Sequence, residues 1–277
     1  MNLIVQGALL ADADLRRIAQ LAGTQRFERL GSGAARLLGA QQDPAIPAYC
    51  ADAGLDYGFV PEGRRLEHMR LLAIDMDSTL ITIECIDEVA DLAGVKAEVA
   101  AITAAAMAGE LNYAQSLRRR VALLRGLEQD ALARVYHERL RISPGAEALL
   151  AAIRGAGLKT LLVSGGFSFF TDRLKARLGL DYSISNAIEI EGGRLSGRVI
   201  GDIVDAEAKA AKLRALRDQL GITRAEIIAI GDGANDLAMM AEAGVSIAYR
   251  AKPVARSKAD YALDHCGLDG VLNLFAS

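Results

Sequence analysis

The chain has 277 residues, of which 52% are apolar and 24% are charged, so it can bury a sizeable core in one large domain or two modest ones. Its formal net charge of −3 and its 5% content of aromatic residues, without Trp, argue against binding to nucleic acid. The three cysteines are far apart, no apolar run approaches the ~18 residues of a membrane span, and Met1–Leu10 lacks a basic start, so we expect a cytoplasmic protein without a membrane partner.

The first 66 residues predict a small α+β module. Their elements follow the order β-α-β-β-α-β, which suits a ferredoxin-like or ACT-like fold. The segment holds no cluster of potential catalytic groups, so regulation, dimerisation and simple packing all stay open as its role, and a homodimer stays open with them. The predicted elements are strand Asn2–Gln6, helix Asp12–Ala22, strands Phe27–Leu30 and Ala34–Leu38, helix Ile46–Leu55 and strand Phe59–Val60.

From residue 67 to residue 277 the pattern changes to short apolar runs that alternate with helix-like segments. Such a pattern predicts a Rossmann-like parallel sheet covered by helices on both faces. In these sheets, ligands bind at the carboxyl ends of the strands, where polar clusters fall in this chain. The predicted strands are Leu71–Met76, Leu158–Ser164, Glu226–Gly231 and Val245–Ala248, the helices include Phe169–Leu178 and Leu237–Ala243, and residues 183–202 read as a hairpin.

About 60 residues between the first two of these strands predict helices instead of a short connection. That length exceeds an ordinary crossover, so we expect an inserted helical cap at about residues 83–146. Its predicted helices are Ile86–Leu92, Lys96–Met107, Tyr113–Leu124 and Asp130–Arg139.

Two acidic side chains follow the first apolar strand in the segment Asp75-Met76-Asp77-Ser78-Thr79-Leu80. Alternate side chains of an extended segment face the same way, so Asp75 and Asp77 can face one site. Two nearby carboxylates repel each other unless a cation or a shared proton intervenes, and a hard ion such as Mg²⁺ fits oxygen ligands. Taken alone, the pair can equally cap the next helix.

Three further polar groups follow strands or begin helices. The segment Gly231-Asp232-Gly233-Ala234-Asn235-Asp236 can supply metal ligands, or it can form a simple acidic turn. Ser164-Gly165-Gly166 offers a hydroxyl and backbone N–H groups to a phosphate. Lys209 lies at a predicted helix start, where a lysine is ordinarily solvated.

The order DxDST, SGG, Lys and GDGxND resembles the haloacid dehalogenase-like hydrolases. This resemblance implies that Asp75 is a nucleophile that forms an aspartyl-phosphate. It implies that Asp77 acts as the proton donor and general base. One Mg²⁺ would be held by the Asp75 carboxylate, the Asp77 backbone carbonyl and Asp232, with Asp236 in support.

The resemblance also implies how the phosphate is bound. Ser164, Gly165 and Asn235 would contact its oxygens. Lys209 would offset the negative charge between the phosphate and the nucleophile.

Segments of the cap are similar to the phosphoserine phosphatase branch of that superfamily, which implies hydrolysis of O-phosphoserine in the last step of serine biosynthesis. Glu84 would pair with the substrate ammonium, and Arg120 would bind its carboxylate in a bidentate fork. Met107 and Tyr113 would shield the site from water. The segments that carry this resemblance are Ile83–Glu88, Ala106–Tyr113 and Ser116–Val121.

Two alternatives stay open. The first is a phosphatase for another small phosphomonoester, or a phosphotransferase that passes phosphate from phosphoserine to an alcohol. The second is a binding or regulatory protein on an inactive hydrolase scaffold, against which the presence of Asp75, Asp77, Lys209 and Asp232 argues.

Overall fold

A computed structural model describes residues 1–276, and their contacts divide the chain into two units. The first unit comprises Met1–Leu72, Ser143–Lys159 and the described residues from Arg217 onward. The second comprises Ala73–Ile142 and Thr160–Leu216. No helix among residues 1–276 combines the length and the apolar composition needed to cross a bilayer.

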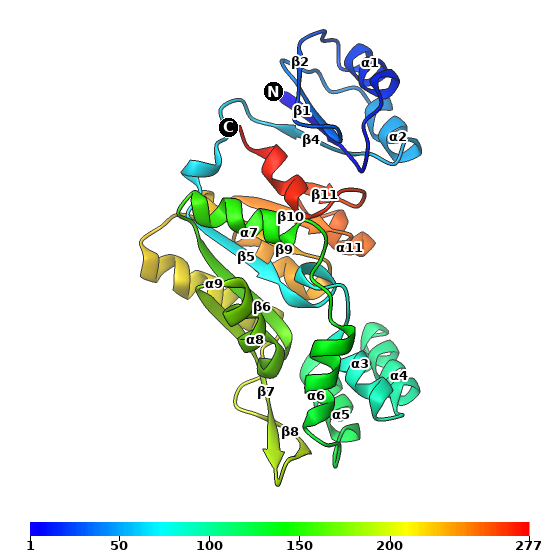
Figure 1. The fold of residues 1–277 in the computed structure, drawn as a ribbon, viewed down its shortest axis with the longest axis vertical. Helices are drawn as coiled ribbons and strands as arrows, with labels where there is room; N and C mark the ends of the chain where they lie inside the picture. The colour runs from blue at the N-terminus through cyan, green and yellow to red at the C-terminus, as the bar shows by residue number, and fades with distance from the viewer. Residues whose placement is uncertain (277) are drawn as a thin grey trace. The chain divides into compact units, whose positions relative to one another are not determined.

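The first unit begins with a four-stranded antiparallel sheet in the order β2-β3-β1-β4. Figure 1 labels three of these strands, β1, β2 and β4. Leu3 and Val5 of the first strand belong to the same apolar cluster as Ile18 of the first helix and Ile46 of the second, so both helices cover one face of the sheet. The predicted order of elements is confirmed. Its members are β1 (Asn2–Gln6), α1 (Asp12–Leu21), β2 (Phe27–Arg29), β3 (Ala34–Leu37), α2 (Ala45–Asp52) and β4 (Asp56–Val60).

The second helix is shorter and the last strand longer than the sequence pattern predicts. Gly54 has a φ of +65°, which L side chains rarely adopt, and the chain leaves the helix before it. β4 then pairs with the whole of β1, from Gln6 opposite Asp56 to Asn2 opposite Val60. The prediction of a helix through Leu55 is therefore wrong, because pairing with β1 determines where this strand starts.

The other face of this small sheet packs against the end of the chain. Both carboxylate oxygens of Asp56 accept hydrogen bonds from the backbone N–H groups of residues 264–266, at 2.7 to 3.0 Å. Arg36 donates to the carbonyl oxygen of Phe275 (2.5 Å), and Asn273 donates to Gln6 (2.6 Å). These contacts hold the module against the end of the chain, and the three roles that the sequence leaves open for it stay predictions.

The first unit also contains parallel strands in the order β11-β10-β9-β5, to which β5 contributes Leu71 and Leu72. Every residue of β9 and β10 is buried, as expected for strands covered on both faces. The elements are β5 (Leu71–Asp75), α7 (Ala146–Gly155), β9 (Ile227–Gly231), α10 (Leu237–Ala241), β10 (Val245–Tyr249), α11 (Pro253–Arg256), β11 (Tyr261–Leu263) and the 3₁₀ helix η6 (Leu268–Leu274).

The second unit continues from the end of β5 in the order β5-β6-β7-β8. β6 is parallel to β7, and β7 forms the predicted antiparallel hairpin with β8. The Ser164-Gly165-Gly166 segment closes a strand and precedes a helix as predicted, but the predicted end of the strand at Ser164 is wrong, because β6 runs on to Phe167 with a shift of register after Val163. The elements are β6 (Lys159–Phe167), α8 (Ser168–Leu178), β7 (Tyr182–Glu191), β8 (Arg194–Ile200) and α9 (Ala206–Leu220).

The cap of the second unit consists of the four predicted helices. An antiparallel bridge between Ile81 and Ile142 joins the two ends of the insertion. The hairpin contacts the cap through hydrogen bonds between the backbones of Leu195 and residues 126 and 127. The helices are α3 (Cys85–Leu92), α4 (Lys96–Met107), α5 (Tyr113–Leu123) and α6 (Asp130–Arg134), which continues as the wider turn η3 (Val135–Arg139). The expected fold class is confirmed: a Rossmann-like α/β protein with a helical cap and a small N-terminal sheet.

Candidate active site

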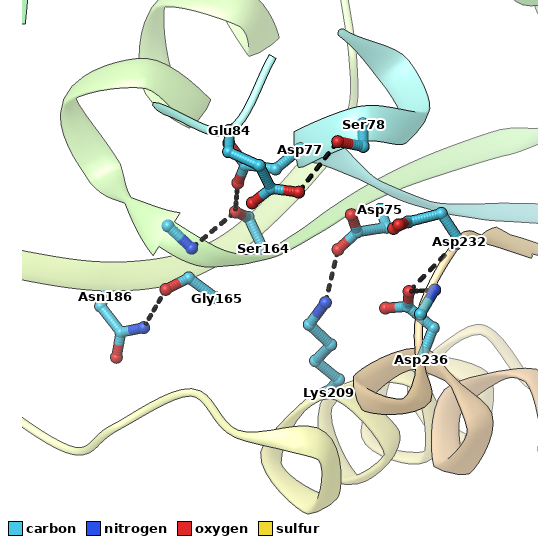
Figure 2. Close-up of polar contacts among 12 residues, drawn as sticks. Asp75, Asp77, Ser78, Glu84, Ser164, Gly165, Asn186, Lys209, Asp232 and Asp236 are labelled. Atoms are coloured by element: carbon cyan, nitrogen blue, oxygen red, sulfur yellow. Dashed lines mark hydrogen bonds and ion pairs between the residues drawn. The ribbon is translucent and has the colours of Figure 1, made fainter. Parts of the chain in front are cut away.

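Asp75 is the last residue of β5 and is only 3% exposed. Lys209 lies in α9 and is 1% exposed, and its Nζ donates to Oδ1 of Asp75 in an ion pair (Figure 2). A buried charge without a partner costs several kcal/mol, and the attraction between the two groups offsets part of that cost. The ordinary expectation of a solvated lysine is therefore wrong for Lys209, which places a fixed positive charge against Asp75.

Asp77 lies in the irregular turn Met76–Leu80, where its own backbone is extended (φ −68°, ψ 134°). Its Oδ1 accepts a hydrogen bond from the backbone N–H of Cys85 (2.8 Å), and its Oδ2 accepts one from Oγ of Ser164 (3.2 Å). Desolvation, followed by the negative charge of Glu84, raises the pKa of Asp77 to about 7 against the opposing effect of these hydrogen bonds. Asp77 can therefore gain or lose a proton near neutral pH, as general acid–base catalysis requires.

Ser78 has a φ of +56°, which is uncommon for a residue other than glycine. Its hydroxyl donates to Oε1 of Glu84 (2.8 Å), which is exposed immediately before α3. Positive φ at a non-glycine residue is typical of functional turns. No role was predicted for Ser78, whose position directly after Asp77 is its one distinguishing feature in the sequence.

The backbone at Ser164-Gly165-Gly166 lies close to other polar groups. The N–H of Gly166 donates to Oγ of Ser164 (2.8 Å), and a Cβ on Gly166 would lie 2.9 Å from Oδ2 of Asp77. Asn186 of β7 donates to the carbonyl oxygen of Gly165 (2.8 Å; Figure 2). Asn186 was not among the predicted site residues, although an Asn inside an otherwise β-prone run is a recognisable signal.

Besides Glu84, three predicted site residues lie in the cap. The hydroxyl of Tyr113 donates to the carbonyl oxygen of Gly165 (2.9 Å), so this side chain is more than the apolar shield that the sequence suggested. Nε of Arg120 is buried and has no hydrogen-bond partner among the described residues, which suits a ligand that would accept from it. Met107 ends α4 and is 78% exposed, so the expectation that it shields the site is not met here.

The remaining predicted residues belong to the first unit, in the loop after β9. Oδ2 of Asp236 accepts from the backbone N–H groups of Asp232 (3.2 Å) and Gly233 (3.1 Å), which holds the loop in shape. Asp232 is 7% exposed, and Nζ of Lys252 lies 3.8 Å from its Oδ2. Asn235 is half-buried beside Gly233.

The predicted residues therefore fall into two groups. The second unit brings Asp75 to Lys209, Asp77 to Ser164, and Tyr113 to Gly165 through hydrogen bonds, and it also carries Glu84, Arg120 and Met107. The first unit carries Asp232, Asn235 and Asp236 in one loop.

Comparison with known proteins gives two family matches. Residues 72–241 match the model of the haloacid dehalogenase-like hydrolases. Residues 3–46 match a domain of unknown function.

Relatives and solved structures agree with the first match. A phosphoserine phosphatase of a Polaromonas species is 55% identical over 215 residues, which cover 76% of this chain and 91% of that protein. The unliganded crystal structure of a probable phosphoserine phosphatase from Vibrio cholerae is 39% identical, with a TM-score of 0.86 over 99% of this chain and 85% of the other. A phospho-aspartyl intermediate analogue of a phosphoserine phosphatase is 38% identical, with a TM-score of 0.70 over 75% of this chain and 99% of the other.

Proposed function

This chain belongs to the haloacid dehalogenase-like hydrolases, and from that premise we propose that it hydrolyses O-phospho-L-serine to L-serine and phosphate. The reaction would pass through an aspartyl-phosphate on Asp75 and would form the last step of serine biosynthesis. The similarity to phosphoserine phosphatases supports the substrate, and the similarity to the phospho-aspartyl analogue supports the intermediate.

The observation that carries the proposal is the difference between the environments of Asp75 and Asp77. Asp75 is buried in an ion pair with Lys209, whereas the pKa of Asp77 is raised to about 7. Two carboxylates two residues apart can therefore take different roles, one as a nucleophile and the other as a proton carrier.

In the first step, a carboxylate oxygen of Asp75 forms a bond to phosphorus while the bond from phosphorus to the serine oxygen breaks. Asp77 gives its proton to the departing serine oxygen. In the second step, Asp77 takes a proton from a water molecule, whose oxygen bonds to phosphorus as the bond to Asp75 breaks. Asp77 thus ends protonated, as it began.

Mg²⁺ is the metal that fits the donors this chain offers. Asp75 and Asp232 are buried carboxylates that follow parallel strands, and hard oxygen ligands of this kind suit Mg²⁺. We infer that these carboxylates and the backbone carbonyl of Asp77 would hold one ion, with Asp236 supporting the loop of Asp232. The ion would supply positive charge against the negative charge that develops on the phosphoryl oxygens.

The other proposed contacts bind the two ends of the substrate, its phosphate and its amino-acid group. The hydroxyl of Ser164, the N–H of Gly165 and Asn235 would contact phosphate oxygens, and Lys209 would offset their charge. At the amino-acid end, Glu84 would accept from the ammonium. The guanidinium of Arg120, with its unpartnered Nε, would donate to the carboxylate.

The test is phosphate release from O-phospho-L-serine and from a panel of other phosphomonoesters, with Mg²⁺ and after its removal by EDTA. The proposal expects phosphoserine to be the preferred ester, and it expects the loss of activity in EDTA to be reversed by added Mg²⁺. An Asp75→Asn variant that folds normally should have no turnover. Undiminished activity of that variant, or preference for an ester without an amino-acid group, would count against the proposal.

A cytoplasmic location and a homodimer remain parts of the proposal. The three cysteines are free and buried, in keeping with a reducing compartment. Measurement of the molar mass in solution by light scattering tests the dimer.

A further inference from the structure

The peptide group between Gly165 and Gly166 is hydrogen-bonded at both of its polar atoms. Its carbonyl oxygen accepts from Nδ2 of Asn186 (2.8 Å) and from the hydroxyl of Tyr113 (2.9 Å). Its N–H, which belongs to Gly166, donates to Oγ of Ser164 (2.8 Å). Because a peptide group is planar, fixing its oxygen from two directions also fixes the direction of its N–H.

The hydroxyl of Ser164 is oriented in turn. Its oxygen accepts from Gly166, and its hydrogen is donated to Oδ2 of Asp77 (3.2 Å). A chain of hydrogen bonds therefore leads from Asn186 and Tyr113 to Asp77, and successive bonds in such a chain polarise and strengthen one another.

Asn186 is built into this arrangement. It is 0% exposed, and its Oδ1 accepts from the backbone N–H of Val204 (2.8 Å) while its Nδ2 donates to Gly165. With both ends of the amide engaged, the side chain has one orientation. Val204 lies in the connection that leads into α9, so the same amide joins Gly165 in β6 to the segment that leads to Lys209.

Tyr113 reaches the same carbonyl from the cap. It begins α5, whose start is fixed by reciprocal hydrogen bonds between Asn112 and Gln115. Its hydroxyl oxygen lies 2.2 Å from the point that a Cβ on Gly165 would occupy, so only glycine allows this approach.

We propose that Asn186 and Tyr113 are positioning residues, which act through the Gly165–Gly166 peptide group to hold the Ser164 hydroxyl against Asp77. This inference rests on the proposed function, because it assigns Ser164 and Asp77 to the reacting end of a phosphomonoester. It gives the Tyr113 hydroxyl and the Asn186 amide a role in catalysis without contact with the substrate.

The test is a double-mutant cycle that combines Tyr113→Phe with Ser164→Ala. Loss of one hydrogen bond in this chain should lower kcat/KM about three- to tenfold in the otherwise unchanged protein. In the Ser164→Ala background, Tyr113→Phe should change kcat/KM less than twofold, because the series of hydrogen bonds to Asp77 is already interrupted at Ser164. An equal factor in both backgrounds, or no effect in either, would overturn the proposal.

Two further variants make the cycle specific. Tyr182→Phe is the matched control, since Tyr182 begins β7 and takes no part in this series of hydrogen bonds, and it should leave kcat/KM unchanged in both backgrounds. Asn186→Asp keeps an acceptor for Val204 but loses the donor to Gly165, so it should lower kcat/KM in the same Ser164-dependent way. If Asn186→Asp does not fold, the Tyr113→Phe cycle decides alone.

The readout separates this inference from the proposed function. If the protein hydrolyses para-nitrophenyl phosphate but not phosphoserine, the proposed substrate fails and the cycle is measured on the other ester. If it hydrolyses neither, binding of inorganic phosphate to the Mg²⁺-loaded protein is measured by titration calorimetry. Tyr113→Phe should then weaken phosphate binding at least threefold, but only where Ser164 is intact, and any other pattern overturns the inference.

Discussion

Nζ of Lys209 forms an ion pair with Oδ1 of Asp75, a residue 134 positions earlier in the chain, and both side chains are nearly excluded from solvent. One residue comes from a helix and the other from the end of a strand. In this pair each buried charge is stabilised by the other, and this mutual stabilisation can be measured.

Replacing Lys209 with Met should lower both activity and stability. We expect kcat/KM to fall at least about a hundredfold, since a fixed positive charge at the reacting groups is lost. The free energy of unfolding should fall by about 3–5 kcal/mol, because Asp75 stays buried without this ion pair. Chemical denaturation and steady-state kinetics provide the two measurements.

The double variant Asp75→Asn/Lys209→Met serves as the internal check. It should regain part of the stability lost in Lys209→Met, since the buried charge of Asp75 is removed together with that of Lys209. Lys212→Met, three residues later in α9 and partly exposed, should have little effect. A double variant less stable than Lys209→Met would contradict this reasoning.

The raised pKa of Asp77 predicts a pH dependence of stability in the metal-free protein. The folded-state pKa of about 7 lies above the ordinary value of 3.8, so between these values the unfolded chain has lost the proton that the folded protein keeps. Stability contributed by this group is therefore lost as the pH rises from about 4 to about 7. Asp77→Asn, measured by thermal denaturation in EDTA, should gain in Tm relative to the parent protein across that range. If the difference in Tm between Asp77→Asn and the parent protein does not change between pH 4 and pH 7, desolvation does not raise the pKa of Asp77 as inferred.

Arg120 should discriminate between substrates by their carboxylate. Arg120→Ala is expected to lower kcat/KM for phosphoserine at least about tenfold more than for phosphoethanolamine, which lacks the carboxylate but keeps the ammonium. Arg119→Ala is the matched control, because Arg119 is exposed on the same helix and should affect neither ester. Equal losses on both esters would remove Arg120 from carboxylate recognition.

Asp56 should hold the N-terminal module in place. Asp56→Ala leaves three backbone N–H groups of residues 264–266 without their acceptor, so the free energy of unfolding should fall by about 2–4 kcal/mol. Well below the new Tm, kcat/KM for phosphoserine should be unchanged. The exposed Asp52, replaced by Ala, should affect stability little. If Asp56→Ala leaves the free energy of unfolding unchanged, the module is held in place by other contacts.

Much of the fold was predictable because its signals are local. Lys96–Met107 has the predicted bounds, and the apolar runs beginning at Leu71 and Val245 form buried strands. The errors occur where distant pairing competes with local pattern. β4 begins at Asp56 because β1 offers its backbone hydrogen-bonding partners from that residue onward. In the same way, β6 runs past Ser164 because β7 pairs with it as far as Phe167.

The sequence by itself determined the class of chemistry, because Asp75, Asp77, Ser164, Lys209 and Asp232 are recognised by residue type and order alone. Only the tertiary structure decided how these groups differ. Desolvation and the charge of Glu84 raise the pKa of Asp77, and burial in an ion pair changes Lys209 from an ordinary helical lysine into the partner of Asp75. Asn186 shows the same principle, since its amide gains a role only when β7 lies beside Gly165. Solvent exclusion and hydrogen bonding between segments far apart in the chain are properties of the fold, so no local pattern of residues specifies them.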